Sequence, residues 1–399
     1  MVGSSNGRRR PLRIATVICS EYEANPRIRR QAEALAARGD QVTVLALYTA
    51  GRPRREVIDG VQVIHTLTRK YRGESPAAYL RLYASFFVHA AGWLVRHPRS
   101  YDLVQTSTLP EAMAFSATLQ RLSGVPVLLD VHDLTELMFA SKFRASGAML
   151  AAVRGSARLS VRFANEVLAV TETDATTLRR WGHRPVTVVM NSPDPRLFPP
   201  RPFQPRSGKE IVFSYHGLIA PRHGLIQAVD ALAKLREELP GVRMQILGSG
   251  DGLPALRARV KEMGVTDIVT LPTSLLPITE VPPLLETAHI GVIPSQRDPW
   301  TNDVLPTKLL EYAVLGIPVV TFRNPVIQQY FPEDSVSYVD PANAENLYVA
   351  MRTLAGDEDR ARRQAQRASE VVAGMAWERQ KQAYYAVIDR MVECRRRAV

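Results

Sequence analysis

The sequence of 399 residues has few cysteines, few aromatic residues and no long apolar run. Its two cysteines, Cys19 and Cys394, exclude a disulfide framework and a cysteine-rich metal cluster, and they favour a reducing compartment such as the cytoplasm. The longest largely apolar stretch, residues 83–95, is shorter than the roughly 20 residues that span a bilayer. The polar, basic start does not resemble a secretion signal, so we expect a soluble or peripheral protein.

Several motifs are also missing. No Gly-x-Gly-x-x-Gly follows the first predicted strand, which argues against an NAD-dependent dehydrogenase. The eight histidines are scattered, and the one acidic triplet, 357–359, lies in a polar helical run, so we expect no metal site. Aromatic residues make up 7%, and no nucleic-acid-binding module is recognisable.

The net charge of +12 is unevenly distributed. Residues 1–200 hold 27 basic and 16 acidic side chains, a surplus of +11, whereas residues 201–399 hold 24 and 23. A basic half suits nucleic acid, an anionic membrane or a phosphorylated substrate, and it is equally explained as solubility charge.

Short β-rich runs alternate with longer helical patterns, which predicts βαβ units, a parallel sheet and ligands at the carboxyl ends of the strands. Six prolines between 193 and 205 interrupt this series, which then begins afresh at 210. We therefore predict an α/β protein of two Rossmann-like, doubly wound domains facing a central cleft. The predicted boundaries are a first domain at 1–195, a proline-rich linker at 196–209, a second domain at 210–375 and a C-terminal helix at 376–399 that crosses back.

The most informative segment is 303–320, DVLPTKLLEYAVLGIPVV. Glu311 lies on a short amphipathic helix that ends at Gly316, directly before a buried strand. Lys308 stands about one helical turn before Glu311, so one interpretation is a simple surface ion pair.

This segment resembles the retaining glycosyltransferases of family 4, which have the two-domain GT-B fold. Their signature is two acidic residues separated by seven others, here Asp303 and Glu311, the second in a helix that leads to a Gly-x-Pro-Val-Val strand. The resemblance implies that Glu311 binds the ribose hydroxyls of the donor and that Asp303 contacts the transferred sugar. A carboxylate suits a vicinal diol because it accepts two hydrogen bonds. Asp303 departs from the glutamate of the family pattern.

The resemblance extends to residues 213–232, which match the first strand, loop and helix of the family's nucleotide-binding domain. It implies that Gly217 and the loop after it bind the donor, with Arg222 as the main diphosphate cation and His223 assisting. Lys308 joins this donor set. A cation at a helix N-terminus is a suitable anion site, and the alternative is an ordinary exposed loop.

In the first half, a buried strand brings His132 to its carboxyl end in VLLDVHDLTE, 127–136. The resemblance implies that His132 reaches the transferred sugar, and the alternative is a structural histidine–aspartate pair. Near the first strand, where many family members have paired glycines, this sequence has Arg27, Arg29 and Arg30. These arginines either compensate in the cleft or form a solvated helix start.

The implied function is transfer of a hexose-type sugar from a nucleoside diphosphate sugar, the co-substrate, to a hydroxyl acceptor with retention of configuration. The resemblance implies neither a metal nor another cofactor. The alternatives are a UDP-sugar 2-epimerase of the same fold, which needs further carboxylates, and a basic nucleic-acid-binding protein.

Residues 69–99 carry an apolar, aromatic helix between flanking arginines. One interpretation is an interfacial helix that brings the protein to the inner membrane surface and to a lipid-linked or anionic acceptor. The other is a core helix with exposed arginine caps.

Overall fold

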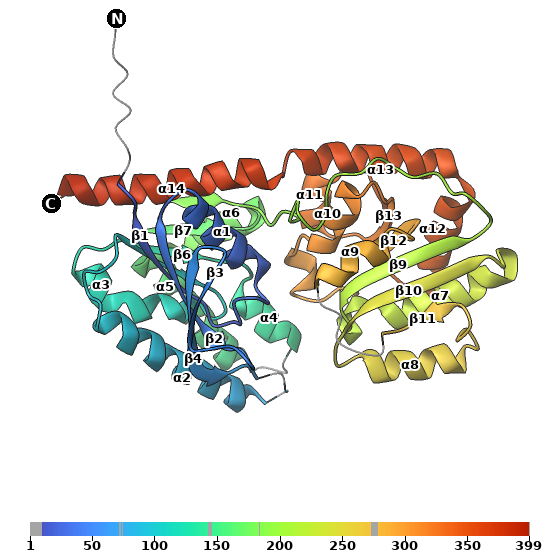
Figure 1. The fold of residues 1–399 in the computed structure, drawn as a ribbon. Coiled ribbons are helices and arrows are strands. Elements are labelled where there is room, and N and C mark those ends of the chain that lie inside the picture. The colour runs from blue at the N-terminus through green and yellow to red at the C-terminus, as the bar shows by residue number, and fades with distance from the viewer. Residues whose placement is uncertain are drawn as a thin grey trace, which may run out of the picture. The chain divides into compact units, whose positions relative to one another are not determined.

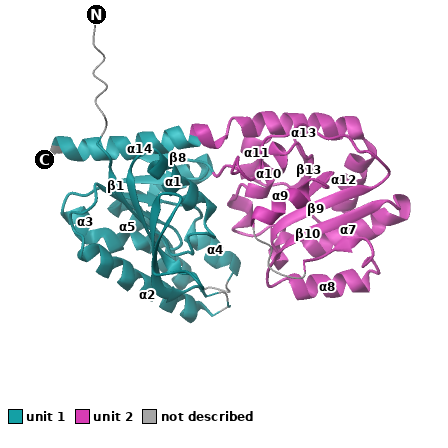
Figure 2. Cartoon of the chain, in the orientation of Figure 1, with its two compact units in different colours: residues 1–190, 380–399 teal, residues 191–379 magenta. Residues whose placement is uncertain are grey.

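The computed structural model describes residues 10–71, 73, 75–142, 146–182, 184–272 and 278–398. The chain forms two compact units (Figure 2). Unit 1 consists of residues 1–190 and 380–399, and unit 2 consists of residues 191–379. Both units are α/β structures built on a largely or wholly parallel sheet.

The sheet of unit 1 has eight strands in the order β3-β4-β2-β1-β5-β6-β7-β8 (Figure 1). All neighbouring strands pair in parallel except β3, which pairs antiparallel with β4. The order grows from β1 in both directions, which is the doubly wound pattern. The strands are β1 (Arg13–Val17), β2 (Gln41–Tyr48), β3 (Arg55–Ile58), β4 (Val61–Arg69), β5 (Leu103–Ser107), β6 (Val127–Asp130), β7 (Glu166–Ala169) and β8 (Val186–Val188).

Helices cover both faces of this sheet, because successive strand residues point to opposite faces. Leu128 of β6 packs with residues of α1 and α14, whereas its neighbours Val127 and Leu129 pack with residues of α2 and α5 respectively. The helices of unit 1 are α1 (Pro26–Ala37), α2 (Pro76–Val95), the 3-10 helix η1 (Glu111–Ala117), α3 (Thr118–Leu122), α4 (Thr135–Lys142), α5 (Gly147–Phe163), α6 (Glu172–Gly182) and, from residue 380, α14 (Trp377–Ala398).

The sheet of unit 2 is wholly parallel, with the order β11-β10-β9-β12-β13-β14. Its strands are β9 (Ile211–Leu218), β10 (Val242–Ser249), β11 (Val269–Thr270), β12 (Ile290–Ile293), β13 (Val319–Phe322) and β14 (Ser337–Val339). Its helices are η2 (Pro221–His223), α7 (Leu225–Glu238), α8 (Leu253–Glu262), η3 (Ile278–Glu280), α9 (Val281–Leu285), η4 (Thr301–Asp303), α10 (Thr307–Val314), α11 (Pro325–Tyr330), α12 (Ala344–Gly356) and α13 (Glu358–Ala373).

The predicted α/β class with two doubly wound sheets is confirmed. The series predicted to begin afresh at 210 starts with β9, which continues to Leu218 because it keeps its pairing with β10. The polar helical run that begins at the acidic triplet 357–359 is α13, and the helix predicted at 376–399 is the separate helix α14.

A buried polar network joins α14 to the sheet of unit 1. Asp130, at the carboxyl end of β6, is fully buried and accepts hydrogen bonds from Arg27 and Gln31 of α1. Gln105 of β5 donates to Gln31 (2.7 Å) and accepts from the hydroxyl of Tyr384 of α14 (2.6 Å). Burial alone would raise the pKa of Asp130, but Arg27 and His132 hold it well below its usual value. The network therefore surrounds a buried negative charge.

Arg27 is neither a solvated helix start nor a free cleft cation, so both interpretations of this residue are wrong. Its guanidinium is buried and lies 2.7 Å from Asp130 Oδ1. Sequence patterns missed this because the partner lies 103 positions away. Arg29, in contrast, remains partly exposed and pairs with Glu33 on its own helix.

Arg27→Ala is expected to destabilise unit 1 by about 3–5 kcal/mol, because it leaves a buried carboxylate without its cation. The matched variant Arg29→Ala removes partly exposed pairs with Glu33 and Asp59 and is expected to cost about 1 kcal/mol or less. Urea unfolding followed by circular dichroism compares the two. Equal losses of unfolding free energy in the two variants would show that the buried Arg27–Asp130 pair contributes no more to stability than the pairs of Arg29.

Candidate active site

The strand order of unit 2 marks the place where a ligand site is expected. The chain leaves β9 in one direction along the sheet and later returns to add β12 on the other side. Loops that follow two such neighbouring strands separate at their carboxyl ends and leave a crevice there. Residues 219–224 follow β9 and residues 294–306 follow β12, and they carry Arg222, His223 and Asp303.

Glu311 hydrogen-bonds to a residue of strand β9 rather than to a residue of its own helix. Leu309, Leu310 and Tyr312 of α10 are buried, and the Tyr312 hydroxyl donates to the Ser214 carbonyl. This packing turns Glu311 toward β9, where its Oε2 lies 2.6 Å from His216 Nε2.

His216 is therefore a residue of the site that sequence reasoning missed. Its ring is nearly fully buried, and its Nδ1 has no hydrogen-bond partner among the described residues. The available signal in the sequence was a histidine inside a mostly apolar strand, IVFSYHGL. An ionised carboxylate can only accept, so Nε2 donates to Glu311 and the second Glu311 oxygen remains for a ligand.

Lys308 lies one turn earlier on α10 and packs against β9. Its Nζ donates to the Tyr215 hydroxyl (3.1 Å) and lies 4.3 Å from the centre of that ring. Gly217 has a φ of 116°, and a Cβ there would stand 3.4 Å from Lys308 Cε, so glycine leaves room for the lysine. Burial and nearby Arg222, opposed by Glu311, lower the pKa of Lys308 to about 8. The simple Lys308–Glu311 surface pair is thus not what the structure contains.

Arg222 and His223 form the short helix η2 directly before α7. The Arg222 guanidinium lies 5.1 Å from the centre of the Trp300 ring, and its buried Nε has no hydrogen-bond partner among the described residues. His223 is buried, and burial together with Lys308 and Arg222 lowers its pKa to about 3. At neutral pH His223 therefore offers a hydrogen bond and no positive charge.

Asp303 ends the helix η4 in the loop after β12, and its backbone N–H donates to the Trp300 carbonyl. Asn324, which is buried, donates to the carbonyls of Thr301 and Val304 on either side of it. The loop that carries Asp303 is therefore fixed to the strand and helix that follow.

His132 lies in unit 1, just beyond the carboxyl end of β6. Its Nε2 is 3.2 Å from Asp130 Oδ2, and its backbone N–H donates to Thr108 Oγ1. Because the low pKa of Asp130 keeps this carboxylate ionised, Nε2 carries the proton and Nδ1 is left as an acceptor. Asp130, two residues before His132, thus fixes the tautomer.

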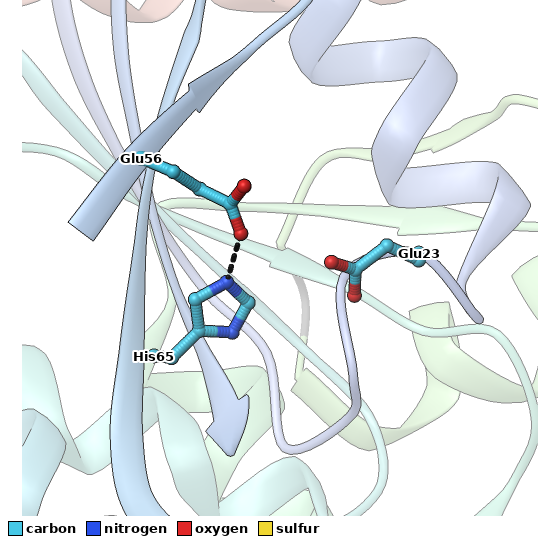
Figure 3. A group of neighbouring side chains, drawn as sticks. All are labelled: Glu23, Glu56 and His65. Atoms are coloured by element: carbon cyan, nitrogen blue, oxygen red, sulfur yellow. Dashed lines mark hydrogen bonds and ion pairs between the residues drawn. The ribbon is translucent and has the colours of Figure 1, made fainter. Parts of the chain in front are cut away.

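One group of three side chains among the described residues has metal-ligand geometry, although the sequence analysis expected none. Glu23, Glu56 and His65 of unit 1 bring their ligand atoms within 4.8 Å of one another (Figure 3). His65 Nε2 lies 2.8 Å from Glu56, and Arg52 contacts both carboxylates, at 3.4 and 3.1 Å. A cation of the chain itself, Arg52, already contacts both carboxylates, so we assign the group no metal.

The architecture of the chain is that of two-domain glycosyltransferases, the GT-B class. It matches sucrose-phosphate synthase from Thermosynechococcus elongatus with a TM-score of 0.78 and 18% identity, over 96% of this chain and 100% of that chain. It also matches HepE from Anabaena, solved with UDP-glucose, with a TM-score of 0.68 and 16% identity, over 95% of this chain and 99% of that chain.

Matches to protein-family models assign each half of the chain to a family. Residues 23–194 match the glycosyl transferase 4-like domain, and residues 200–371 match glycosyl transferases group 1. The chain therefore belongs to the glycosyltransferases, with a 4-like first half and a group 1 second half.

Curated relatives match over smaller parts. An exopolysaccharide phosphotransferase of Streptomyces coelicolor is 30% identical over 43% of this chain and 18% of its own length. Glycogen synthase of Mycobacterium tuberculosis is 26% identical over 70% of this chain and 63% of its own length. The chain thus spans less than two thirds of these relatives. Within the described residues, no helix is both long and apolar enough to cross a membrane.

Proposed function

We propose that this protein transfers a hexose-type sugar from a nucleoside diphosphate sugar to a hydroxyl acceptor, with retention of configuration and without a metal. The observation that carries the proposal is the group of Arg222, Lys308 and Glu311 around the carboxyl end of β9. Two cations suit a diphosphate, and a carboxylate fixed through one oxygen suits a ribose diol. HepE, the neighbour solved with UDP-glucose, supports a nucleotide sugar as donor.

In the proposed reaction, the bond between the anomeric carbon and the phosphate oxygen breaks, and the acceptor oxygen bonds to the same face of the sugar. The acceptor proton passes to the departing diphosphate. Arg222 and Lys308 stabilise the charge that develops on the leaving group, the role that a metal ion plays elsewhere. We assign His132, through Nδ1, and Asp303 to contacts with the transferred sugar.

Glu311→Gln tests the donor site. The amide presents a donor where a ribose hydroxyl requires an acceptor, so we expect UDP affinity to fall by about 1–3 kcal/mol while the melting temperature without ligand stays unchanged. Titration calorimetry with UDP, and with other nucleoside diphosphates in parallel, measures the loss. The exposed Glu237 on α7 provides the control Glu237→Gln. Unchanged affinity for every nucleotide in Glu311→Gln would remove this carboxylate from the site.

Donor binding is expected to weaken at alkaline pH. With a pKa of about 8, Lys308 is charged below that value and loses its proton as the pH rises through it. The affinity for UDP-glucose, whose diphosphate does not titrate in this range, should therefore be nearly constant from pH 6 to about 7.5 and then decline until the pH passes the higher pKa that Lys308 has beside the bound diphosphate. Lys308→Arg should remove the decline, because arginine stays charged. Arg222→Ala should weaken binding at every pH and keep the decline. If donor affinity still declines at alkaline pH in Lys308→Arg, the titrating group is a residue other than Lys308.

His132 is expected to act in turnover and not in nucleotide binding, because the diphosphate cations lie in unit 2. His132→Ala should lower kcat at least about tenfold, or ~1.4 kcal/mol, and leave the Kd for UDP within about twofold. Sugar-nucleotide hydrolysis without acceptor provides the rate where the acceptor is unknown. A parallel loss of rate and nucleotide affinity would show that His132 is structural.

A further inference from the structure

Three helices on one face of the unit 1 sheet carry no acidic residue. They are α2, α3 and α5, and together with the turn that follows α2 they contain only basic charge. The core contacts place α2 and α5 on the face of the sheet opposite α1 and α14 (Figure 1), and hydrogen bonds connect α3 to both. The exposed basic side chains of this face are Arg81, Arg96, Arg99, Arg158 and Arg162, with Arg121 half-buried. Arg154 of α5 is also exposed, but it pairs with Glu136 of α4.

The same helices also carry most of the exposed apolar side chains of unit 1. Of its eight exposed large hydrophobic residues among those described, only Val57 and Leu67 lie elsewhere. The remaining six, with their exposed fractions, are Leu80 (70%), Val88 (68%), Val95 (54%), Leu119 (36%), Leu122 (79%) and Leu159 (57%).

On α2 these residues form a continuous stripe. Leu80, Ala84, Val88 and Val95 are spaced by four, four and seven residues and are all exposed. Such spacing puts them on one side of a helix, while the opposite side is buried through Leu82, Phe86, Ala90 and Leu94. The helix therefore has an apolar surface on both sides, and only one side serves the core. The core-helix interpretation of this segment explains the inner side and leaves the outer stripe unexplained.

The three helices form one surface, because α3 connects the other two. Gln120 of α3 donates to the Leu94 carbonyl at the end of α2 (2.6 Å). Arg121 donates to the Phe163 carbonyl at the end of α5 (3.2 Å). Val95 and Leu122, both exposed, therefore lie beside the arginines that follow α2 and end α5.

We propose that this face, formed by α2, α3 and α5, binds the surface of an anionic lipid bilayer. Apolar side chains enter the interface, and the arginines around them meet lipid phosphates. Arginine caps at helix C-termini account for some of these charges, but they do not account for three helices without any acid or for the outward leucines and valines. A protein partner of mixed charge would meet no acidic side chain on these helices, so charge complementarity favours lipid.

A cavity beside this face is suited to a phosphate group. It has a volume of about 350 Å³, lies at the amino ends of β6, β7 and β8, and is lined by Arg121, Arg390 and Arg395. Glu166 pairs with Arg390 there, and the other two arginines bind backbone carbonyls. The lining thus keeps an excess of positive charge next to α3.

The test is co-sedimentation of the full chain with vesicles of phosphatidylglycerol and phosphatidylcholine, or of phosphatidylcholine alone, at low and high salt. We expect binding to the anionic vesicles at low salt and release at high salt. The double variants Leu80→Ser/Val88→Ser and Arg96→Ala/Arg99→Ala should each reduce the bound fraction at least about tenfold. Both change only exposed side chains, so the fold, checked by circular dichroism, is kept.

Matched controls lie in unit 2. Leu284→Ser/Val349→Ser removes two exposed apolar side chains, and Arg360→Ala/Arg363→Ala removes two exposed charges from α13. Both should bind vesicles like the unaltered chain.

No binding to anionic vesicles at low salt would overturn the proposal. So would α2 variants that bind normally, or a change in oligomeric state in Leu80→Ser/Val88→Ser without vesicles, which would assign the face to a second copy. The assay requires no sugar transfer, so its result is independent of the proposed reaction.

Discussion

The charge of Asp130 is the constraint on which unit 1 depends. An ionised carboxylate without solvent requires a full set of donors, and no single element of the fold supplies them. Arg27 and Gln31 come from α1, and Gln105 from β5 connects the group to Tyr384 of α14. The network therefore explains why the end of the chain, residues 380–399, packs with its beginning. It also gives His132 a fixed tautomer, so stability and the candidate chemistry share one carboxylate.

In unit 2 the main constraint is a different one. Cations must lie close to the end of strand β9 without filling the space that a ligand needs. Gly217 and Gly248 face each other in the β9–β10 register, and a Cβ on Gly248 would stand 1.8 Å from the Gly217 carbonyl oxygen. The two strands thus end in close backbone contact. Lys308 lies over the surface that Gly217 leaves open, and Arg222 rests on Trp300. Both cations are held by aromatic rings rather than by carboxylates, so their charge is not cancelled.

The fold could be predicted from the sequence because local signals repeat along the chain. The helix carrying Lys308 and Glu311 follows from apolar periodicity and a closing glycine. Partners distant in sequence could not be predicted in this way. Glu311 pairs with His216, 95 positions away, and Arg27 pairs with Asp130, 103 positions away. Periodicity assigns a residue to a face, whereas the partner depends on strand order and register, which the pattern does not contain.

The distribution of charge in the basic first half also depends on the three-dimensional arrangement and not on the sequence pattern. A surplus of +11 over 200 residues says nothing about where the charge lies. The structure keeps most acidic side chains away from three helices: Asp130 and Glu111 are buried, and Asp102 accepts from the Arg13 backbone at the sheet end. Glu136 of α4 pairs with Arg154 of α5. The charged side chains that remain outward on α2, α3 and α5 are basic, and exposed apolar residues lie among them. Solubility alone does not require such a segregation, because mixed charge keeps a surface soluble equally well. Charge and exposed apolar area gather on the same three helices, which is the combination that an anionic, partly apolar surface selects.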